Sequence, residues 1–279
     1  MRLAVVDARA TLLTDAGPVD VERESEGRFP SDVTRLYEKW AAFREWARGY
    51  PSAPSTAPLP ASAFLGPVSP RPAQILAVGL NYVDHAAESG FGVPEAPIVF
   101  TKFASSIAGP FDQLALSGDS VDWEVEMVAV IGIGGRAISA ADALDHVAGF
   151  TVGQDYSDRE VQFLGAPAQF SLGKSFPGFA PLGPVLVSPE DMPAPEKTVL
   201  ECMVDGEVMQ SAPLSDLIFP VPDLIARLSA VVTLTPGDLI FTGTPPGVGF
   251  GMSPRRYLRR GEVVRASITG IGAIEQVCA

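Results

Sequence analysis

Three acidic residues, Asp122, Glu124 and Glu126, occupy alternate positions in the segment VDWEVEMVAVIG. Successive side chains of a β-strand point to opposite faces, so a strand here would place the three carboxylates on one face and Trp123 and Met127 on the other. Clustered carboxylates repel one another, and their burial is costly unless a cation pairs with them. Since oxygen ligands favour hard cations, the pattern predicts a site for Mg²⁺, Mn²⁺ or Ca²⁺. The alternative is an edge strand with a solvated polar face.

Two further segments carry residues that would suit such a site. Asp155 follows the apolar run AGFTVGQ, so at the end of a strand it would supply another carboxylate; alternatively it caps a helix or turn. His85 and Glu88 are three residues apart in GLNYVDHAAESG. A helix would place them on one face, where the carboxylate makes the imidazole a general base for water. An ordinary surface pair is the alternative.

Three polar residues follow Asp155 in a region rich in glycine and aromatic side chains: Arg159, Gln162 and Lys174. Such donors suit a substrate carboxylate or a developing oxyanion. Each on its own is also typical of a solvated surface.

Two nucleotide-binding motifs are nearly present. The segment GIGGRA at 132–137 fits G-x-G-x-x-A after a strand, with Asp155 about 20 residues later. The helix signal begins only at Ser139, however, and a helix from there to about His146 is short for a crossover between parallel strands. The segment 173–175, Gly-Lys-Ser, lacks the glycine-rich cradle of a phosphate-binding loop. A NAD-dependent dehydrogenase is therefore the weaker alternative.

Short strands are the main elements expected to position these residues. From Gln74 onward, apolar runs such as ILAVGL and DLIFTGTP alternate with Gly and Pro, and the Asp205-Gly206 pair predicts a tight hairpin. Helices are expected around 83–89, from Ser139, and near 222–229. We predict a β-rich catalytic domain over 73–279. A small N-terminal subdomain, with a helical stretch around 33–47, and a proline-rich connector are expected over 1–72.

Composition excludes several classes of partner. The 279 residues are 47% hydrophobic, enough for a full core, and the formal net charge is −13. This charge repels phosphate backbones and anionic membrane surfaces, so neither nucleic acid nor a membrane is expected as a partner. No apolar run approaches the roughly 20 residues of a membrane span, and a cytoplasmic protein is expected. Cys202 and Cys278 lack metal-site spacing and are expected to be free thiols.

Taken together, these segments resemble the fumarylacetoacetate hydrolase family, in particular its smaller members that hydrolyse acylpyruvates or decarboxylate or isomerise related acids. The resemblance runs from about Ile75 to Gly272. It is carried by GLNYVDHAAE, PIVFTKFASSIAGP, VDWEVEMVAVIG, GFTVGQDYSDREVQF, FSLGKSFPGFAPLGP, SDLIFPVPDLI and TLTPGDLIFTGTPPGVG. Phe103, where proline is common in the family, and the ending GAIEQVCA are departures that bear on pocket shape.

The resemblance implies a mixed α/β, β-rich fold: a mixed β-roll with a small N-terminal subdomain. It implies Mg²⁺ or Mn²⁺ as the cofactor and a homodimer as the assembly. The implied metal ligands are Glu124, Glu126 and Asp155, with Asp122 as a neighbour. The implied catalytic residues are His85, Glu88 and Lys174, and the implied substrate-binding residues are Arg159, Gln162 and Thr244.

The implied reaction is hydrolysis of a carbon–carbon bond in a small anionic keto acid, a 1,3-diketo acid such as an acylpyruvate. The metal would stabilise the enolate that leaves, and His85, paired with Glu88, would deprotonate the attacking water. Lys174 would stabilise the developing charge. Decarboxylation or isomerisation of an oxaloacetate-type acid on the same site is the alternative, and a non-catalytic protein with this fold is a third.

Overall fold

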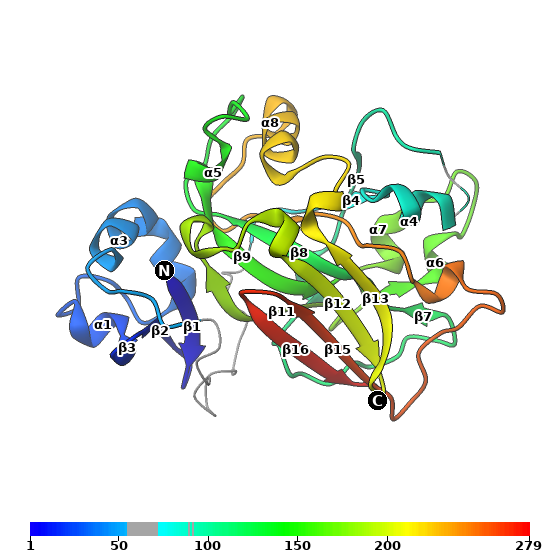
Figure 1. Ribbon diagram of the computed structural model, residues 1–279, viewed down its shortest axis with the longest axis horizontal. Coiled ribbons are helices and arrows are strands. Elements are labelled where there is room, and N and C mark those ends of the chain that lie inside the picture. Colours follow the sequence, from blue (N-terminus) through cyan, green and yellow to red (C-terminus); the bar gives the residue numbers. More distant parts are fainter. Residues whose placement is uncertain (55–71, 89, 91) are drawn as a thin grey trace.

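The computed structural model describes residues 1–54, 72–88, 90 and 92–279 (Figure 1). Most of the expected proline-rich connector, residues 55–71, lies outside the described residues. Within them, no helix is long and apolar enough to cross a membrane.

A ten-stranded sheet forms the centre of the molecule. Its strand order is β3 (Gly17–Asp20), β2 (Arg9–Thr14), β1 (Arg2–Val6), β11 (Ala180–Val187), β9 (Val147–Gln154), β8 (Val125–Ile131), β14 (Leu239–Phe241), β4 (Ile75–Gly79) and β5 (Ile98–Thr101), with β6 (Ile107–Ala108) beside β11. Among the strands of the described residues, β14 with β4 and β11 with β6 are the parallel pairs. Because β1 pairs with β11, the N-terminal strands extend this sheet. The predicted division at residue 72 stays a prediction.

A second, four-stranded sheet packs on the first. Its order is β13 (Glu207–Pro213), β12 (Val199–Val204), β15 (Val263–Ile268) and β16 (Gly272–Val277). One buried cluster joins the two sheets, with Met127 and Val152 from the large sheet and Cys202 and Val264 from the small one. The fold is thus mixed and β-rich, as predicted, and the sheets are not closed.

The Asp205-Gly206 hairpin is confirmed. It connects β12 to β13, and both residues have positive φ, at 49° and 82°, as a tight two-residue turn requires. Cys202 and Cys278 are buried free thiols, also as predicted.

The described helices are short. They are α1 (Val21–Glu24), α2 (Val33–Leu36), α3 (Trp40–Ala47), α4 (Val83–Glu88), α5 (Ala143–His146), α6 (Arg159–Gln162), α7 (Phe170–Gly173) and α8 (Val221–Val231). The 3₁₀ turns are η1 (Tyr37–Lys39), η2 (Ala104–Ser106), η3 (Pro189–Asp191), η4 (Pro195–Lys197), η5 (Leu214–Asp216) and η6 (Gly249–Gly251). The helix expected from Ser139 begins only at Ala143, because the Ser139 hydroxyl bonds the side chain and backbone N–H of Asp142 in a turn that precedes the helix.

The near-match to a dinucleotide motif has another structural role. Residues 132–137 lie in the connection from β8 to β9, and these two strands are antiparallel, so the parallel crossover of a dinucleotide fold is absent here. Gly134 lets two backbones approach closely, because a Cβ there would lie 2.7 Å from the carbonyl oxygen of Leu234.

Candidate active site

The acidic segment forms two strands instead of the single strand expected. Strand β7 (Val121–Asp122) pairs with β10 (Ser157–Asp158), whereas β8 starts at Val125 and runs between β9 and β14. Asp122, Glu124 and Glu126 are all buried. The alternative of a solvated edge strand is therefore wrong, and the carboxylates need compensating charge.

Asp155 joins two of these carboxylates. It follows β9 directly, and its N–H donates to the carbonyl oxygen of Glu124 at 2.9 Å. One oxygen from each of Glu124, Glu126 and Asp155 lies within 4.8 Å of the others. Two oxygens that each lie about 2.4 Å from one hard cation are at most about 4.8 Å apart. The donor set and its spacing therefore fit a single divalent cation, although the role of these residues as ligands stays a prediction.

Three buried cations surround the carboxylates. The Lys174 ammonium lies 2.8 Å from Glu124 and 2.7 Å from Asp155, and Arg159 Nη1 lies 2.7 Å from Glu124 Oε1. Lys102 Nζ lies 2.6 Å from the other oxygen of Asp155 and also donates to the carbonyl oxygen of Lys174. Each carboxylate oxygen of Glu124 and Asp155 thus meets a cation.

Glu126 has a different environment. The described residues give its carboxylate one hydrogen bond, from the N–H of Gly243 at 2.7 Å. Burial, with Asp155 and Glu124 close by, raises the pKa of Glu126 well above its usual value. Burial also acts to raise the pKa of Glu124, but Lys174 and Arg159 outweigh it and lower that pKa to about 2. Glu126 is therefore the carboxylate that most lacks a positive partner.

Asp122 fixes the loop that follows Gly247. Its carboxylate lies 2.6 Å from Arg159 Nη2 and accepts hydrogen bonds from the N–H groups of Gly249 and Phe250 at 2.8 and 2.9 Å. It is thus a neighbour of the cluster, holding Arg159 from the side opposite Glu124.

The His85–Glu88 pair lies on α4, which residues 80–82 connect to β4. His85 Nδ1 is 2.8 Å from Glu88 Oε1, and Glu88 also accepts a hydrogen bond from the N–H of Gly247 at 3.0 Å. His85 is 6% exposed, so this is not an ordinary solvated surface pair. His85 and Glu124 line the same pocket.

The predicted substrate-binding residues also line this pocket. The Gln162 side-chain oxygen accepts a hydrogen bond from Arg159 Nη1 at 2.8 Å. The Thr244 hydroxyl donates to the carbonyl oxygen of Val125 at 2.9 Å and accepts from Gln210 at 2.8 Å. The structure thus brings all nine predicted site residues into one region, and their roles stay predictions.

Four aromatic rings in mutual contact also line the pocket. Phe100 and Phe163 each meet Phe170 edge to face at 5.8 Å, and Phe163 stacks on Phe250 at 5.0 Å. The two end rings contact site cations, Lys174 over Phe100 at 5.1 Å and Arg159 over Phe250 at 5.6 Å. We call these four residues the aromatic arc.

Sequence reasoning gave no role to Lys102 or to the aromatic arc. Lys102 comes just after β5 and reaches Asp155, 53 residues later. Phe163 and Phe170 are seven residues apart, but Phe100 and Phe250 come from distant segments of the chain, so no local spacing connects all four rings. Their aromatic type is the only sequence signal, and it is equally typical of a core.

Comparison with known proteins agrees with this geometry. The model of the family "Fumarylacetoacetate (FAA) hydrolase C-terminal" matches residues 74–278. The human mitochondrial oxaloacetate tautomerase FAHD2A is 48% identical over 213 residues, which are 76% of this chain and 68% of that protein. An HpcE protein from Mycobacterium smegmatis has a crystal structure with a TM-score of 0.92 and 49% identity over 100% of both chains.

A fumarylpyruvate hydrolase from Pseudomonas aeruginosa, crystallised with Mn²⁺ and pyruvate, has a TM-score of 0.68 and 33% identity. The match covers 76% of this chain and 91% of that one. The similar proteins thus include hydrolases, isomerases and oxaloacetate tautomerases. The chain therefore belongs to the fumarylacetoacetate hydrolase family.

Proposed function

We propose that this protein is a Mg²⁺- or Mn²⁺-dependent hydrolase that cleaves a carbon–carbon bond in an acylpyruvate-type 1,3-diketo acid. The observation that carries the proposal is the position of His85, which is hydrogen-bonded to Glu88 and lines the same pocket as Glu124 of the carboxylate cluster. The related hydrolase crystallised with Mn²⁺ and pyruvate supports both the metal and the type of product.

The charge of the site favours an anionic substrate once a divalent cation is bound. Counted in their ionised forms, four buried carboxylates exceed the buried cations by one negative charge: Asp122, Glu124, Glu126 and Asp155 against Lys102, Arg159 and Lys174. A divalent cation held by Glu124, Glu126 and Asp155 reverses this sign. The site is then complementary to the carboxylate of a 2-oxo acid.

The His85–Glu88 hydrogen bond favours one tautomer of the neutral imidazole. With Nδ1–H donating to Glu88, Nε2 is left to accept a proton from water. The water oxygen attacks the distal carbonyl, the carbon–carbon bond breaks, and its electron pair stays on the pyruvate fragment as an enolate. The proton held by His85 then returns to that carbon. The metal, when bound, supplies the positive charge that stabilises the enolate.

The aromatic arc favours an apolar acyl group at the distal end of the substrate. The pocket-lining cations Arg159 and Lys174 are already paired with carboxylates, so among the described residues lining the pocket no cation is left for a second substrate carboxylate. The four rings of the aromatic arc instead offer an apolar surface that suits an alkyl or aryl group. We infer that the acyl group is apolar.

Oxaloacetate tautomerisation is the second candidate, and the names of the relatives at 46–48% identity favour it. That reaction needs a proton moved between carbon and oxygen without attack by water. His85 is placed for such a transfer as well. The two reactions therefore differ in whether the carbon–carbon bond breaks.

Turnover of benzoylpyruvate, acetylpyruvate and oxaloacetate separates these candidates. Each is incubated with Mg²⁺ or Mn²⁺, beside an EDTA-treated control and the same control with metal restored. Release of pyruvate from an acylpyruvate, lost with EDTA and regained with metal, supports the hydrolase. Loss of the oxaloacetate enol absorbance with no pyruvate from any substrate supports the tautomerase and contradicts the hydrolase.

A further inference from the structure

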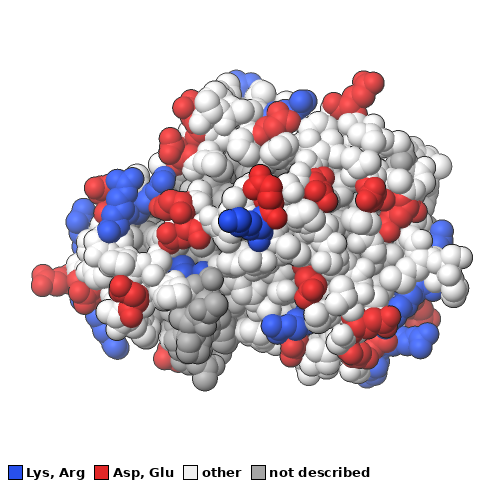
Figure 2. Space-filling view, viewed as in Figure 1, with Lys and Arg blue, Asp and Glu red and all other residues white. Residues whose placement is uncertain are grey.

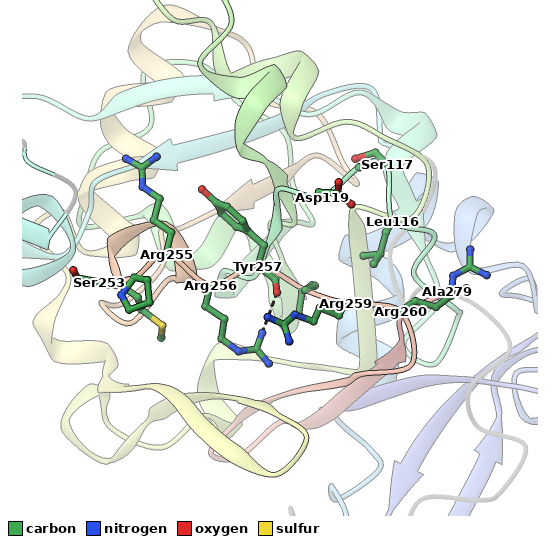
Figure 3. A pocket seen from close by; sticks show the side chains of 14 residues that line it. Leu116, Ser117, Asp119, Ser253, Arg255, Arg256, Tyr257, Arg259, Arg260 and Ala279 are labelled. Atoms are coloured by element: carbon green, nitrogen blue, oxygen red, sulfur yellow. Dashed lines mark hydrogen bonds between the residues drawn. The ribbon is translucent and has the colours of Figure 1, made fainter.

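We propose that a groove rich in arginine, outside the catalytic pocket, binds a small molecule that carries phosphate groups. The groove has a volume of about 1110 Å³ and is lined by residues 116–119 and 252–260, with Ala279 at one end (Figure 3). None of the predicted site residues lines it. We call it the arginine groove.

The positive charge of the groove is concentrated and largely free. Four of the 20 basic residues stand within six positions, in the segment RRYLRR at 255–260. Only Arg256 has an ion pair, with Glu262 at 2.8 Å; within the described part of the chain, Arg255, Arg259 and Arg260 are exposed and have no ion pair with a carboxylate. In a chain with a net charge of −13, this groove is therefore a local site of attraction for anions.

The segment that carries these arginines is held in place. Leu258 is buried, and its N–H donates to the carbonyl oxygen of Val121 at 2.8 Å. The Arg256 guanidinium lies 5.3 Å from the centre of the Trp123 ring, and Arg255 lies 4.1 Å from that of Phe250. A fixed backbone reduces the entropy lost when a ligand orders the side chains.

The arrangement of the side chains indicates the chemistry of the ligand. Figure 3 shows Arg255 on one side of Tyr257 and Arg256 and Arg259 on the other, with Arg260 farther along. Guanidinium groups bind phosphate oxygens through paired hydrogen bonds, whereas a single carboxylate would occupy only one of them. The half-buried Tyr257 ring between them offers a surface for a base. A nucleoside polyphosphate fits both features.

The charges on the surface agree with a small ligand. Figure 2 shows basic and acidic side chains interspersed over the visible face, with several basic ones next to acidic ones at its lower right. Asp119 also lines the groove, so the positive charge is local and does not form a long basic track. A long phosphate backbone would need such a track.

Isothermal titration calorimetry with excess Mg²⁺ tests the proposal with three probes: ATP, tripolyphosphate and adenosine. The double variant Arg259→Gln/Arg260→Gln removes two groove charges. The matched control Arg227→Gln/Arg265→Gln removes two exposed charges that pair elsewhere, with Asp223 and Glu275. Both double variants have the same net charge. A difference in binding between them therefore reports the loss of local contacts in the groove and not the change in the net charge of the protein.

We expect saturable binding of ATP and tripolyphosphate, weakened about tenfold or more in the groove variant and unchanged in the control. Tighter binding of ATP than of tripolyphosphate would indicate that the adenine base packs on the Tyr257 ring. The proposal is overturned if neither phosphate probe binds the wild-type protein saturably, or if both double variants weaken binding equally.

Discussion

Replacing Asp122 with asparagine tests whether the loop after Gly247 is held by charge. The Asp122 side chain is completely buried and receives the Arg159 guanidinium at 2.6 Å and two backbone N–H groups at 2.8 and 2.9 Å. Asparagine keeps the shape of the side chain but loses its negative charge. Its NH₂ group cannot accept a hydrogen bond, so it would face either the Arg159 guanidinium or the two backbone N–H groups without bonding them. Arg159 remains paired with Glu124 alone.

The cost of this change follows from the burial of the pair. Removing one partner of a buried ion pair costs about 3–5 kcal/mol where the other charge is left uncompensated. Arg159 keeps Glu124 as a partner in the variant, so we expect the lower end of this range, about 3 kcal/mol. At about 2–4 °C per kcal/mol for chains of this size, the melting temperature should fall by roughly 6–12 °C. Turnover should also fall, since Phe250 of this loop lines the catalytic pocket.

Differential scanning calorimetry of Asp122→Asn at neutral pH measures this effect. Asp119→Asn is the matched control, because Asp119 is exposed and has no ion pair within the described residues. Its melting temperature should stay near that of the wild type. A fall of less than about 2 °C for Asp122→Asn would refute the reasoning, because the buried pair would then contribute little.

Three further predictions concern the catalytic dyad, the aromatic arc and the thiols. His85→Ala should lower kcat about 10²- to 10⁴-fold with an unchanged circular dichroism spectrum, and near-full activity would remove His85 from the mechanism. Phe170→Leu should lower kcat/KM about 2- to 12-fold more for benzoylpyruvate than for acetylpyruvate, from the loss of aromatic contacts. Gly79→Ala should also lower kcat/KM more for benzoylpyruvate, because the new Cβ would occupy space beside Phe100 and Phe170, at 3.7 and 3.8 Å, without a clash that disturbs the fold. Equal effects on both substrates would contradict the role of the aromatic arc. Burial raises the pKa of both Cys202 and Cys278 to about 12, so neither should react with Ellman's reagent at pH 8 until urea unfolds the chain, and rapid reaction of the native protein would contradict their burial. Unfolded thiols ionise near pH 8.5 whereas these stay neutral in the fold, so their contribution to stability should decline above that pH.

The alternation of carboxylates from Asp122 to Glu126 was enough to predict an acidic cluster, because side-chain direction in an extended chain depends only on local geometry. The Asp205-Gly206 hairpin was predictable for the same reason. The break after Asp122 was not, because it arises when β7 pairs with β10 and β8 joins another sheet. Such pairing depends on distant segments.

Long-range contacts also explain what was missed at the site. Asp155 receives Lys102 and Lys174 from segments on either side of it in the sequence, and no spacing relates the three. The resemblance to a family supplied the ligand set, and the structure added the paired cations. The homodimer and the cytoplasmic location stay predictions.

Calorimetric titration of Mn²⁺ into the EDTA-treated protein and its Glu126→Gln variant tests the central claim most directly. Glu126 has no ion pair with any described residue, so glutamine there removes a carboxylate ligand without leaving a buried cation unpaired. We predict one Mn²⁺ per wild-type chain and binding at least about tenfold weaker in the variant. One Mn²⁺ bound with unchanged affinity by Glu126→Gln, or no Mn²⁺ bound by the wild type, would contradict a metal site at Glu124, Glu126 and Asp155.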